Sequence, residues 1–351
     1  MSFRVAILGA TGLVGQTLLS ILEERSFPVS ELLPLASARS AGASVSFRGE
    51  AVVVQEAVPD AFEGVDIVLS SAGASVSRRL LPEAARRGAV SVDNTSAYRM
   101  DPAVPLVVPE VNAHRIPEYG EQRILANPNC STIQLVLVLK PLLDTFGLRR
   151  VVVSTYQSSG GAGAEAMRQL EEDSRADLAG EPLPQRGDDA AFPSTLAFDC
   201  LPQIDVFREA GETKEEEKMR RETPKILEVE VPLSATCVRV PVRIGHSEAV
   251  WVETEKEASP QAVRELLATA PGVAVVDDPS AALASGRYPT ARAADGRDPV
   301  YVGRIRRDTS RSDDHGLALW VVADNIRKGA ALNAVQVAEG LVEHWRQHGR
   351  S

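Results

Sequence analysis

The residues with the clearest chemical potential form the run Asn-Pro-Asn-Cys-Ser-Thr at positions 127–132. Pro128 and Asn129 are turn residues, and the apolar stretch 133–143 is long enough to be a helix. Cys130 would then lie at a helix N-terminus, where free N–H groups and the helix dipole stabilise negative charge. Such a site favours the thiolate, which is the nucleophilic form of cysteine.

The alternative is that Cys130 is a buried structural residue, which is the commoner fate of an unselected cysteine. The polar turn before it and the motifs elsewhere in the chain favour the reactive interpretation. The chain has only two further cysteines, Cys200 and Cys237. This number and spacing give neither a disulfide framework nor a metal site, so we expect a reducing cytoplasm and no metal.

A glycine-rich turn follows the first strand-like run, residues 3–8, and opens the first helix-like run, residues 13–25. Residues 9–15 read Gly-Ala-Thr-Gly-Leu-Val-Gly, a variant of the dinucleotide-binding fingerprint. The glycines permit a tight turn and bring the backbone close to a pyrophosphate at the helix N-terminus. A glycine-rich turn without a ligand is the alternative, and the strand–turn–helix context disfavours it.

The end of the second predicted strand, near Leu35, bears on the choice of nucleotide. An NAD site places Asp or Glu there to bind the ribose 2′-hydroxyl. This chain instead has Arg39 between the hydroxyls of Ser37 and Ser40. An arginine without a neighbouring acid suits a 2′-phosphate, so the sequence favours NADP over an ordinary polar loop.

Two later motifs place polar residues near the ends of strand-like runs. Gln157 follows the run 151–156 and precedes a glycine-rich turn, so its amide could face a ligand. His246 lies just past the run 238–242 and after Arg239, which suits a general base beside a carboxylate site. Neither motif is decisive alone, since a lone histidine is more often structural.

The elements that must position these residues alternate between strand-like and helix-like in the first third of the chain. This alternation predicts a parallel sheet covered by helices, with a boundary at about residue 130. The segment 249–255 alternates in part, which suits a sheet with one solvated face. The further strand-like runs are 52–54, 65–69, 89–92, 123–126, 249–254, 273–276 and 317–322, the helix-like runs are 76–87, 164–178, 214–221, 260–268 and 331–347, and a loop fills 180–193.

Length and charge limit the possible partners. A chain of 351 residues suggests about two domains. The formal net charge of −10 argues against a nucleic-acid or anionic-membrane partner, so local Arg and Lys side chains must bind any anionic substrate. We see no charged leader before an apolar segment and no long apolar span, and we therefore expect neither export nor membrane insertion.

Together these motifs are far more specific than any one of them, and the chain resembles the aspartate-β-semialdehyde dehydrogenase family over nearly its whole length. The segments that carry the resemblance are 9–15, 37–40, 127–132, 156–163, 239–247, 302–306 and 324–331. Asn129 and Ser131 flank Cys130 as they do in these enzymes. Two positions depart from the family pattern: Gly160 replaces a serine, and Ala291 stands where a proline is expected.

Two other classes remain as alternatives. One is a different enzyme on the same scaffold, either an acylglutamyl-phosphate reductase or a CoA-thioester reductase. The Asn-Cys-Ser run and the placement of Arg239 and Lys218 disfavour it. The other is a non-enzymatic protein that senses the redox state of the cofactor. Such a protein would not need Cys130, Gln157, Arg239 and His246 together.

The resemblance implies a reversible reaction in which L-aspartyl 4-phosphate is reduced by NADPH to L-aspartate 4-semialdehyde. Cys130 would displace phosphate and form a thioester, which hydride transfer converts to a thiohemiacetal and then to the aldehyde. His246 would be the acid and base, and Gln157 would orient the reacting group. The reaction belongs to the biosynthesis of lysine through diaminopimelate, and of threonine, methionine and isoleucine.

The resemblance also assigns the anion-binding residues. Arg239 would bind the substrate α-carboxylate through a two-pronged ion pair, and Glu215 would bind its ammonium group. Arg99, Asn129 and Lys218 would bind phosphate. Considered alone, Arg99 reads as a surface arginine, and the charged run that contains Glu215 and Lys218 reads as a solvated helix face.

The implied fold is a Rossmann-like NADP-binding domain over residues 1–130 and an α+β catalytic and dimerisation domain over residues 131–330. The C-terminal helix, residues 331–347, is expected to return to the first domain. We expect a homodimer or homotetramer that acts on small molecules. The implied cofactor-binding residues are Gly9, Thr11, Gly12, Leu13, Val14, Gly15, Ser37, Arg39, Ser40, Ser71, Gly73, Gly160, Gly161 and Asn325.

Overall fold

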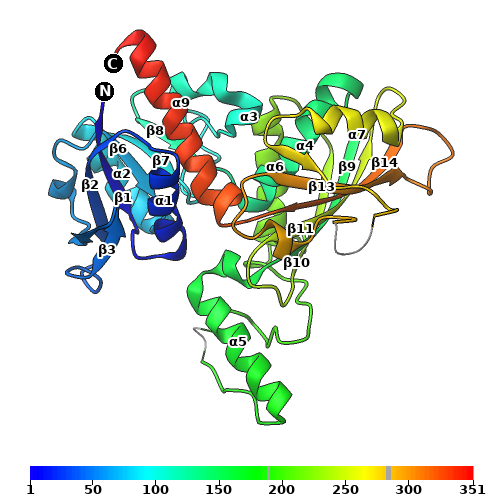
Figure 1. Cartoon of the computed structure of the whole chain (residues 1–351), viewed down its shortest axis with the longest axis horizontal. Coiled ribbons are helices and arrows are strands. Elements are labelled where there is room, and N and C mark those ends of the chain that lie inside the picture. The colour runs from blue at the N-terminus through cyan, green and yellow to red at the C-terminus, as the bar shows by residue number, and fades with distance from the viewer. Residues whose placement is uncertain (188–189, 282–285, 351) are drawn as a thin grey trace. The chain divides into compact units, whose positions relative to one another are not determined.

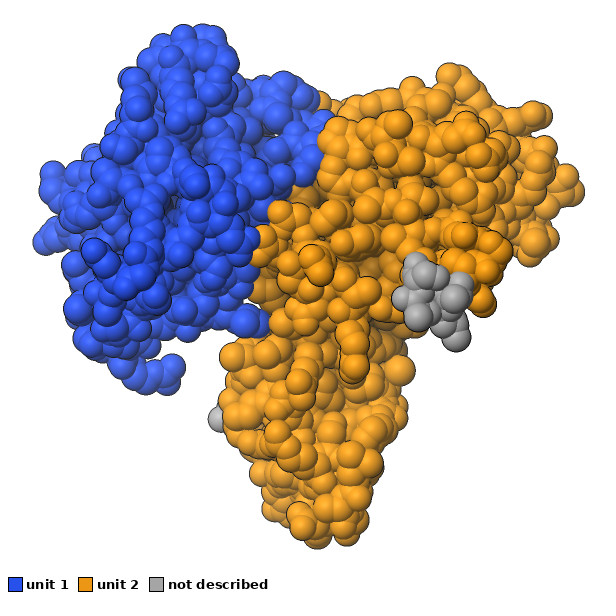
Figure 2. Space-filling view, viewed as in Figure 1, with its two compact units in different colours: residues 1–129, 329–351 blue, residues 130–328 orange. Residues whose placement is uncertain are grey.

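The computed structural model describes residues 1–187, 190–281 and 286–350, which form two compact units (Figures 1 and 2). The first unit comprises residues 1–129 and 329–351, and the second comprises residues 130–328. The chain thus enters the second unit at Cys130 and ends in the first unit with helix α9 (Leu332–His348). Within the described ranges, no helix has the length and apolar character that a membrane span requires.

A six-stranded parallel sheet forms the centre of the first unit, in the order β5–β2–β1–β6–β7–β8. The strands are β1 (Phe3–Leu8), β2 (Val29–Ala36), β5 (Gln55–Glu56), β6 (Ile67–Ser70), β7 (Val90–Asp93) and β8 (Ile124–Ala126), and a separate hairpin comprises β3 (Ser44–Phe47) and β4 (Glu50–Val53). Strands buried on both faces are apolar along their length, as β1 and β6 are. The predicted Rossmann-like class is confirmed.

Helices complete the first unit, and α9 is the one that joins it from the far end of the chain. Its residues Val335, Val342 and Trp345 recur at helical spacing and are buried in the same core as Phe3 of β1. The indole N–H of Trp345 donates to the hydroxyl of Tyr119 at 3.2 Å. The other helical segments are α1 (Leu13–Glu24), α2 (Ala74–Arg86), α3 (Pro109–Asn112) and the 3₁₀ turns Pro59–Phe62 and Ala113–Glu118.

The second unit is built on a mixed six-stranded sheet in the order β10–β9–β11–β14–β13–β12. Its strands are β9 (Arg150–Gln157), β10 (Leu233–Arg239), β11 (His246–Glu253), β12 (Val273–Val275), β13 (Val300–Arg307) and β14 (Gly316–Ala323). Helices α4 (Cys130–Phe146), α6 (Lys214–Leu227) and α7 (Pro260–Ala268) cover one face of the sheet (Figure 1). The aromatic side chains of Tyr156 and Trp251 remain partly exposed.

Helix α5 (Ala164–Ala179) extends away from this sheet in Figure 1. It has a small core of its own, in which Leu170 packs with Phe192, Leu196 and Leu201. The predicted loop 180–193 contains no helix or strand in its described part, and residues 188–189 lie outside the described residues. The short helix α8 (Ala291–Ala294) and the 3₁₀ turn Ser159–Ala162 complete the unit, and the π-helical turn Arg327–Ala331 contains the chain's return from the second unit to the first.

One error in the predicted elements lies between β10 and β11, and β13 was not among the predicted strands. Only Val238 and Arg239 of the predicted run 238–242 belong to a strand, because β10 ends at Arg239 and Pro241 has no N–H to donate to a neighbouring strand. His246 is therefore the first residue of β11 and does not follow a strand as predicted. Helix α6 also continues past the predicted end at 221 to Leu227, with Pro224 inside it.

A tight contact between Gly15 of α1 and the preceding loop generates a prediction. A Cβ atom at Gly15 would lie 2.2 Å from the carbonyl oxygen of Gly9, whereas one at Gly12 would lie 3.4 Å from that oxygen. We expect Gly15→Ala to lower the free energy of unfolding by about 1–3 kcal/mol, the usual cost of overpacking. Gly12→Ala should have a smaller effect. Urea denaturation measures both, and equal losses would show that the close approach is not the cause.

Candidate active site

The loop before Cys130 is fixed by amide side chains of the first unit. Asn127 accepts a hydrogen bond from Asn333 Nδ2 at 2.7 Å and donates to Asn94 Oδ1 at 2.8 Å. Its backbone N–H donates to the carbonyl oxygen of Asp93 at 2.8 Å. The turn that follows ends at Cys130, where α4 begins, as the sequence predicts. Cys130 is partly exposed, so a reagent or substrate can reach it.

Strand pairing in the second unit brings three of the predicted residues to one edge of the sheet. Gln157 is the last residue of β9 and is the register partner of Arg239, the last residue of the parallel strand β10. His246 begins β11, which is antiparallel to β9, so its first residue lies beside the end of β9. All three side chains are buried. The predicted residues therefore meet because of strand register, although they are far apart in sequence.

The amide of Gln157 is held in one orientation by two hydrogen bonds. Its Nε2 donates to Glu215 Oε1 at 3.1 Å, and its Oε1 accepts from the hydroxyl of Thr155 at 3.1 Å. The same Nε2 lies 3.3 Å from Nε2 of His246. Gln157 thus lies between the carboxylate of α6 and the imidazole of β11 and presents a fixed amide at the centre of the cluster.

The ring of His246 is held by the turn after β9. The backbone N–H of Ser158 donates to Nδ1 at 3.0 Å, which assigns the proton of the neutral ring to Nε2. The hydroxyl of Ser158 donates to Asn325 Oδ1, and this oxygen also accepts the N–H of Gly245. Burial and, to a smaller extent, the positive charge of Arg239 lower the pKa of His246 to about 3. The ring is therefore neutral at physiological pH.

Arg239 is a buried cation at the edge of this cluster. Its Nη1 donates to the carbonyl oxygen of Ser158 at 2.6 Å. Burial lowers the pKa of Arg239, while the charges of Glu215 and Cys130 oppose that shift. The guanidinium therefore interacts electrostatically with the acid on α6 and with the first residue of α4. This arrangement can hold an anionic group close to a cysteine.

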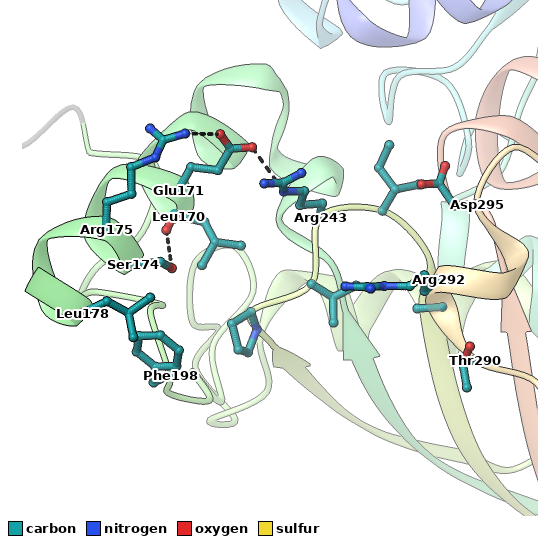
Figure 3. Close-up of a pocket in the computed structure, with 14 residues that line it drawn as sticks. Leu170, Glu171, Ser174, Arg175, Leu178, Phe198, Arg243, Thr290, Arg292 and Asp295 are labelled. Carbon is teal, nitrogen blue, oxygen red and sulfur yellow. Dashed lines mark hydrogen bonds and ion pairs between the residues drawn. The ribbon is translucent and has the colours of Figure 1, made fainter. Parts of the chain in front are cut away.

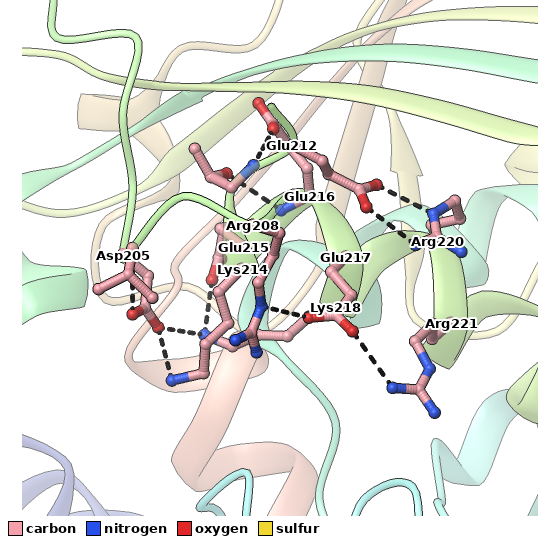
Figure 4. Close-up of polar contacts among 12 residues, drawn as sticks. Asp205, Arg208, Glu212, Lys214, Glu215, Glu216, Glu217, Lys218, Arg220 and Arg221 are labelled. Atoms are coloured by element: carbon pink, nitrogen blue, oxygen red, sulfur yellow. Dashed lines mark hydrogen bonds and ion pairs between the residues drawn. The ribbon is translucent and has the colours of Figure 1, made fainter. Parts of the chain in front are cut away.

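Helix α6 contributes a charged network in which the interpretation as a solvated face is wrong for Glu215 (Figure 4). Glu215 is only 4% exposed, and its Oε2 accepts from Lys218 Nζ at 2.9 Å. Lys218 also donates to Asp205 at 3.3 Å, and Asp205 forms an ion pair with Lys214 at 3.0 Å. Glu217, on the same helix, does bind exposed arginines. The structure thus joins Lys218 to Glu215, beside Gln157.

Two of the predicted phosphate-binding residues lie in the first unit. Arg99 is 8% exposed, so the interpretation as a surface arginine is wrong. Its guanidinium donates to the carbonyl oxygens of Asn127 at 2.9 Å and Asn94 at 2.7 Å. Asn129 is buried as well and directly precedes Cys130. Arg99 is thus anchored to the same loop that leads to the cysteine.

The glycine-rich loop of the first unit has the features of a dinucleotide site. Gly9 has a φ of 92°, and a Cβ there would lie 3.0 Å from the backbone of Ser71, so only glycine fits. The chain order reverses between β1 and β6, which is where open parallel sheets bind ligands. Helices α1 and α2 begin after Gly12 and Gly73 without side-chain caps or acidic residues in their first turns, which suits a phosphate.

The remaining predicted cofactor residues fall into two groups. Thr11, Leu13, Val14 and Gly15 belong to this loop and the start of α1, and Ser37, Arg39 and Ser40 follow the end of β2. In contrast, Gly160, Gly161 and Asn325 lie in the second unit beside the cluster around His246. A Cβ at Gly161 would lie 3.1 Å from both Arg239 and His246, so this glycine leaves space around those groups.

The two departures from the family pattern have local structural explanations. A Cβ at Gly160 would lie 2.7 Å from the carbonyl oxygen of Arg243, so a serine would force that loop to move. Ala291 is the first residue of α8, after the N-cap Thr290. Proline is favoured at the first position of a helix, because a backbone N–H at that position has no helical partner. Alanine is also compatible with this position.

Sequence reasoning missed three residues that hold the cluster in place. Thr155 lies two positions before Gln157, and its strand spacing places it on the same face of β9. Ser158 directly follows Gln157, and its main-chain N–H carries no sequence signal. Asp205 lies in a loop with a φ of 68° and pairs with the lysines of α6 only through tertiary structure.

An open cavity of about 910 Å³ lies between α5, the loop 241–244 and α8 (Figure 3). Glu171 of α5 joins two of its sides, because it pairs with Arg243 of the loop as well as with Arg175 on its own helix. None of the predicted site residues lines this cavity. Among the described residues, no group of His, Cys, Asp and Glu side chains is arranged to hold a metal ion.

Comparison with known proteins identifies the family. A family model described as the NAD-binding domain of semialdehyde dehydrogenase matches residues 4–119, and one described as its dimerisation domain matches residues 139–328. The aspartate-semialdehyde dehydrogenase of Aquifex aeolicus is 53% identical over 345 residues, covering 98% of this chain and 99% of the relative. This chain belongs to the aspartate-semialdehyde dehydrogenase family.

Other members of the family extend the match. The enzyme of Bacillus subtilis is 48% identical, covering 96% of this chain and 97% of its own. The crystal structure of aspartate semialdehyde dehydrogenase II from Vibrio cholerae, complexed with ASA, has a TM-score of 0.93 at 46% identity and covers 98% and 99% of the two chains. An enzyme from Candida albicans with NADP has a TM-score of 0.72 at 27% identity and covers 97% and 98%. The chain is therefore an oxidoreductase with an NAD(P)-binding domain and a dimerisation domain.

The buried, neutral state of His246 predicts a pH dependence of stability. An unfolded histidine takes up a proton near pH 6.5, whereas the folded chain protonates His246 only near pH 3. Between these values the unfolded state binds more protons, so the free energy of unfolding falls as the pH falls. In His246→Gln this decline should be shallower, by up to about 1.4 kcal/mol per pH unit. Urea denaturation at several pH values between 4 and 7 measures the slopes, and identical slopes would contradict a neutral, buried His246.

Proposed function

We propose that this chain catalyses the reversible, NADPH-dependent reductive dephosphorylation of L-aspartyl 4-phosphate to L-aspartate 4-semialdehyde. The observation that carries the proposal is the buried cluster of Gln157, Glu215, Arg239 and His246 in the unit that begins with Cys130. It combines a nucleophile, a neutral imidazole, a cation and an anion. These are the groups that a zwitterionic acyl phosphate requires.

Cys130 acts as the nucleophile on the C4 carbonyl carbon of the substrate. Its thiolate forms a C–S bond, and the C–O bond to phosphate breaks, which leaves a thioester. When bound, NADPH supplies the hydride that reduces this thioester. The resulting thiohemiacetal collapses to the aldehyde, and the C–S electron pair returns to Cys130 as the thiolate. In the reverse direction, phosphate attacks the thioester.

His246 and Gln157 manage the proton and the orientation of the reacting group. In its neutral form, the ring carries its proton on Nε2, the nitrogen beside the amide of Gln157. That proton stabilises the oxygen of the thiohemiacetal, and the ring recovers it when the aldehyde forms. The fixed Gln157 amide holds the intermediate by a further hydrogen bond, because Thr155 and Glu215 prevent it from rotating.

The charged groups of the substrate match the charges of the site. Arg239 binds the α-carboxylate, and Glu215 binds the ammonium group. Lys218, with Arg99 and Asn129, binds phosphate. Lys218 is held by Glu215 and Asp205, so an arriving phosphate exchanges one of these partners for its own oxygen atoms. These cationic side chains thus compensate the negative charge of the substrate locally, although the net charge of the chain is −10.

The cofactor is NADP, and the protein acts as a homodimer or homotetramer in the cytoplasm. Arg39, with Ser37 and Ser40, follows β2 where the ribose is expected, and no acidic residue stands among them. The partly exposed aromatic residues Tyr156 and Trp251 on the second sheet support its use as a subunit interface. The product feeds the biosynthesis of lysine, threonine, methionine and isoleucine.

The test of the proposed function is NADPH formation from aspartate semialdehyde, which should require phosphate. Cys130→Ser places a poorly ionised hydroxyl where a thiolate is needed, so the rate should fall by roughly a thousand-fold or more. Cys200→Ser changes an exposed cysteine and serves as the matched control, with the rate retained. A folded Cys130→Ser protein with near wild-type activity would refute the mechanism. Preference for N-acetylglutamyl phosphate or malonyl-CoA would refute the substrate.

The assignment of NADP predicts a selective effect of Arg39. Loss of a charge-assisted contact to the 2′-phosphate costs about 1.5–3 kcal/mol, which corresponds to roughly ten- to a hundred-fold in affinity. Arg39→Ala should therefore raise the KM for NADP by that factor and leave the KM for NAD nearly unchanged. Steady-state kinetics with both nucleotides measures the two effects. Equal losses would show that Arg39 does not recognise the 2′-phosphate.

A further inference from the structure

Beneath the catalytic cluster lies a second polar pair to which the mechanism above gives no role. Gln134 on α4 and Glu248 on β11 are both fully buried. Neither side chain completes a hydrogen bond of normal geometry with the described residues, so four polar atoms are left without partners: Nε2 and Oε1 of Gln134, and both carboxyl oxygens of Glu248. Orphaned buried groups of this kind are costly and rare, and a facing pair of them calls for a physical account.

The position of this pair follows the geometry of the helix and the strand. Gln134 lies four residues after Cys130, so both stand on one face of α4, about 6 Å apart along the axis. Glu248 lies two residues after His246, so both point to one face of β11, about 6.8 Å apart. The two spacings nearly match. One helical turn on α4 thus corresponds to one side-chain repeat on β11.

Helix α4 and strand β11 also run in the same direction. Gln134 acts on the carboxyl of Glu248 closely enough to lower its pKa. Beyond the far end of β11, the backbone N–H of Lys256 donates to the carbonyl oxygen of Phe146, the last residue of α4, at 2.9 Å. Helix α4 and the β11 segment are therefore aligned both at Gln134 and Glu248 and at Phe146 and Lys256. Cys130 lies one helical turn before Gln134 on α4, and His246 lies one side-chain repeat before Glu248 on β11.

The surroundings of Glu248 favour its neutral form. Burial raises its pKa well above the usual range, and the negative charge of Glu215 on α6 raises it further. The thiol of Cys237 on β10 is the other titratable group that acts on it, and burial raises the pKa of that thiol too. A neutral carboxylic acid is complementary to a primary amide. Its O–H donates to the amide oxygen while its carbonyl oxygen accepts an amide N–H.

We propose that Glu248 and Gln134 form a hydrogen-bonded acid–amide pair that fixes the register of α4 on β11 and so positions Cys130 against His246. Glu248 is thus a positioning residue one repeat away from the chemistry. The consequence for the reaction rests on the proposed roles of Cys130 and His246. The geometric part of the proposal, that the pair sets the environment of the thiol, does not depend on the identity of the substrate.

The experiment compares the variants Glu248→Leu, Gln134→Leu, the double Leu variant and Glu248→Gln. Glu248→Gln keeps two complementary hydrogen bonds, because two amides can pair as an acid and an amide do. Val250→Ala on the same strand is the control for lost packing alone. Three quantities are measured: the melting temperature, kcat and KM, and the pH profile of iodoacetamide alkylation of the Cys130 peptide followed by mass spectrometry.

Each single Leu variant should lower kcat by about ten- to a hundred-fold with KM changed less than about three-fold, the pattern of a misplaced catalytic group. The alkylation profile of Cys130 should shift with it. The double Leu variant should regain melting temperature over the single variants, because no orphaned polar group remains, yet keep the low kcat. Glu248→Gln should stay within about three-fold of wild type. Val250→Ala should lower the melting temperature and leave the alkylation profile unchanged.

Two results would overturn the proposal. One is a double Leu variant with wild-type kcat and alkylation profile, since the pair would then serve burial alone. The other is a Glu248→Gln protein as impaired as Glu248→Leu, since pairing would then not be the relevant property. If the wild-type chain does not reduce aspartyl phosphate but the alkylation profiles shift as expected, the proposed function fails and the positioning role stands.

Discussion

The structure of the second unit depends on a buried pair of opposite charges, Arg239 and Glu215, at one edge of a sheet. Charges removed from water are costly unless each is compensated. Here the carboxylate accepts from Gln157 and Lys218, and the guanidinium donates to the carbonyl oxygen of Ser158. These partners come from strands and a helix that must therefore keep their register. The same contacts that make the charges tolerable also orient the amide and the imidazole.

The chain passes from the first unit to the second at Cys130, so the position of this crossing determines where the thiol lies. Asn127 and Arg99 fix the loop within the first unit, and the helix of the second unit begins two residues after Pro128, at Cys130. Cys130, the proposed nucleophile, is thus the first residue of a 17-residue helix that is buried along much of its length. The packing of α4 therefore fixes the position of Cys130. Substrate-binding and nucleotide-binding residues can then vary without displacing the thiol.

The sequence predicted what local signals encode and missed what tertiary pairing decides. The spacing of glycines after β1, the cysteine at the start of α4 and the bounds of α7 all follow from turn, cap and periodicity rules. The end of β10 and the start of β11 did not follow from these rules. Val240 and Val242 resemble strand residues, and only the strand pairing in the structure shows that they lie outside both strands. The burial of Arg99 and Glu215 was equally invisible, since each is determined by segments distant in the chain. Asp205 was missed for the same reason, whereas Thr155 is a local partner of Gln157 that no motif rule singles out.

The hydrogen bond from the Ser158 N–H to Nδ1 of His246 limits how protons move in this site. A main-chain N–H offers no lone pair to the ring, so this contact favours the tautomer that carries the proton on Nε2. In the proposed mechanism, the imidazole therefore gives and takes its proton at Nε2, the nitrogen beside Gln157. The ring is fully buried, so solvent has no second route to it. In the proposed mechanism, the buried ring and the intermediate therefore share one proton within a catalytic cycle, without exchange with bulk water.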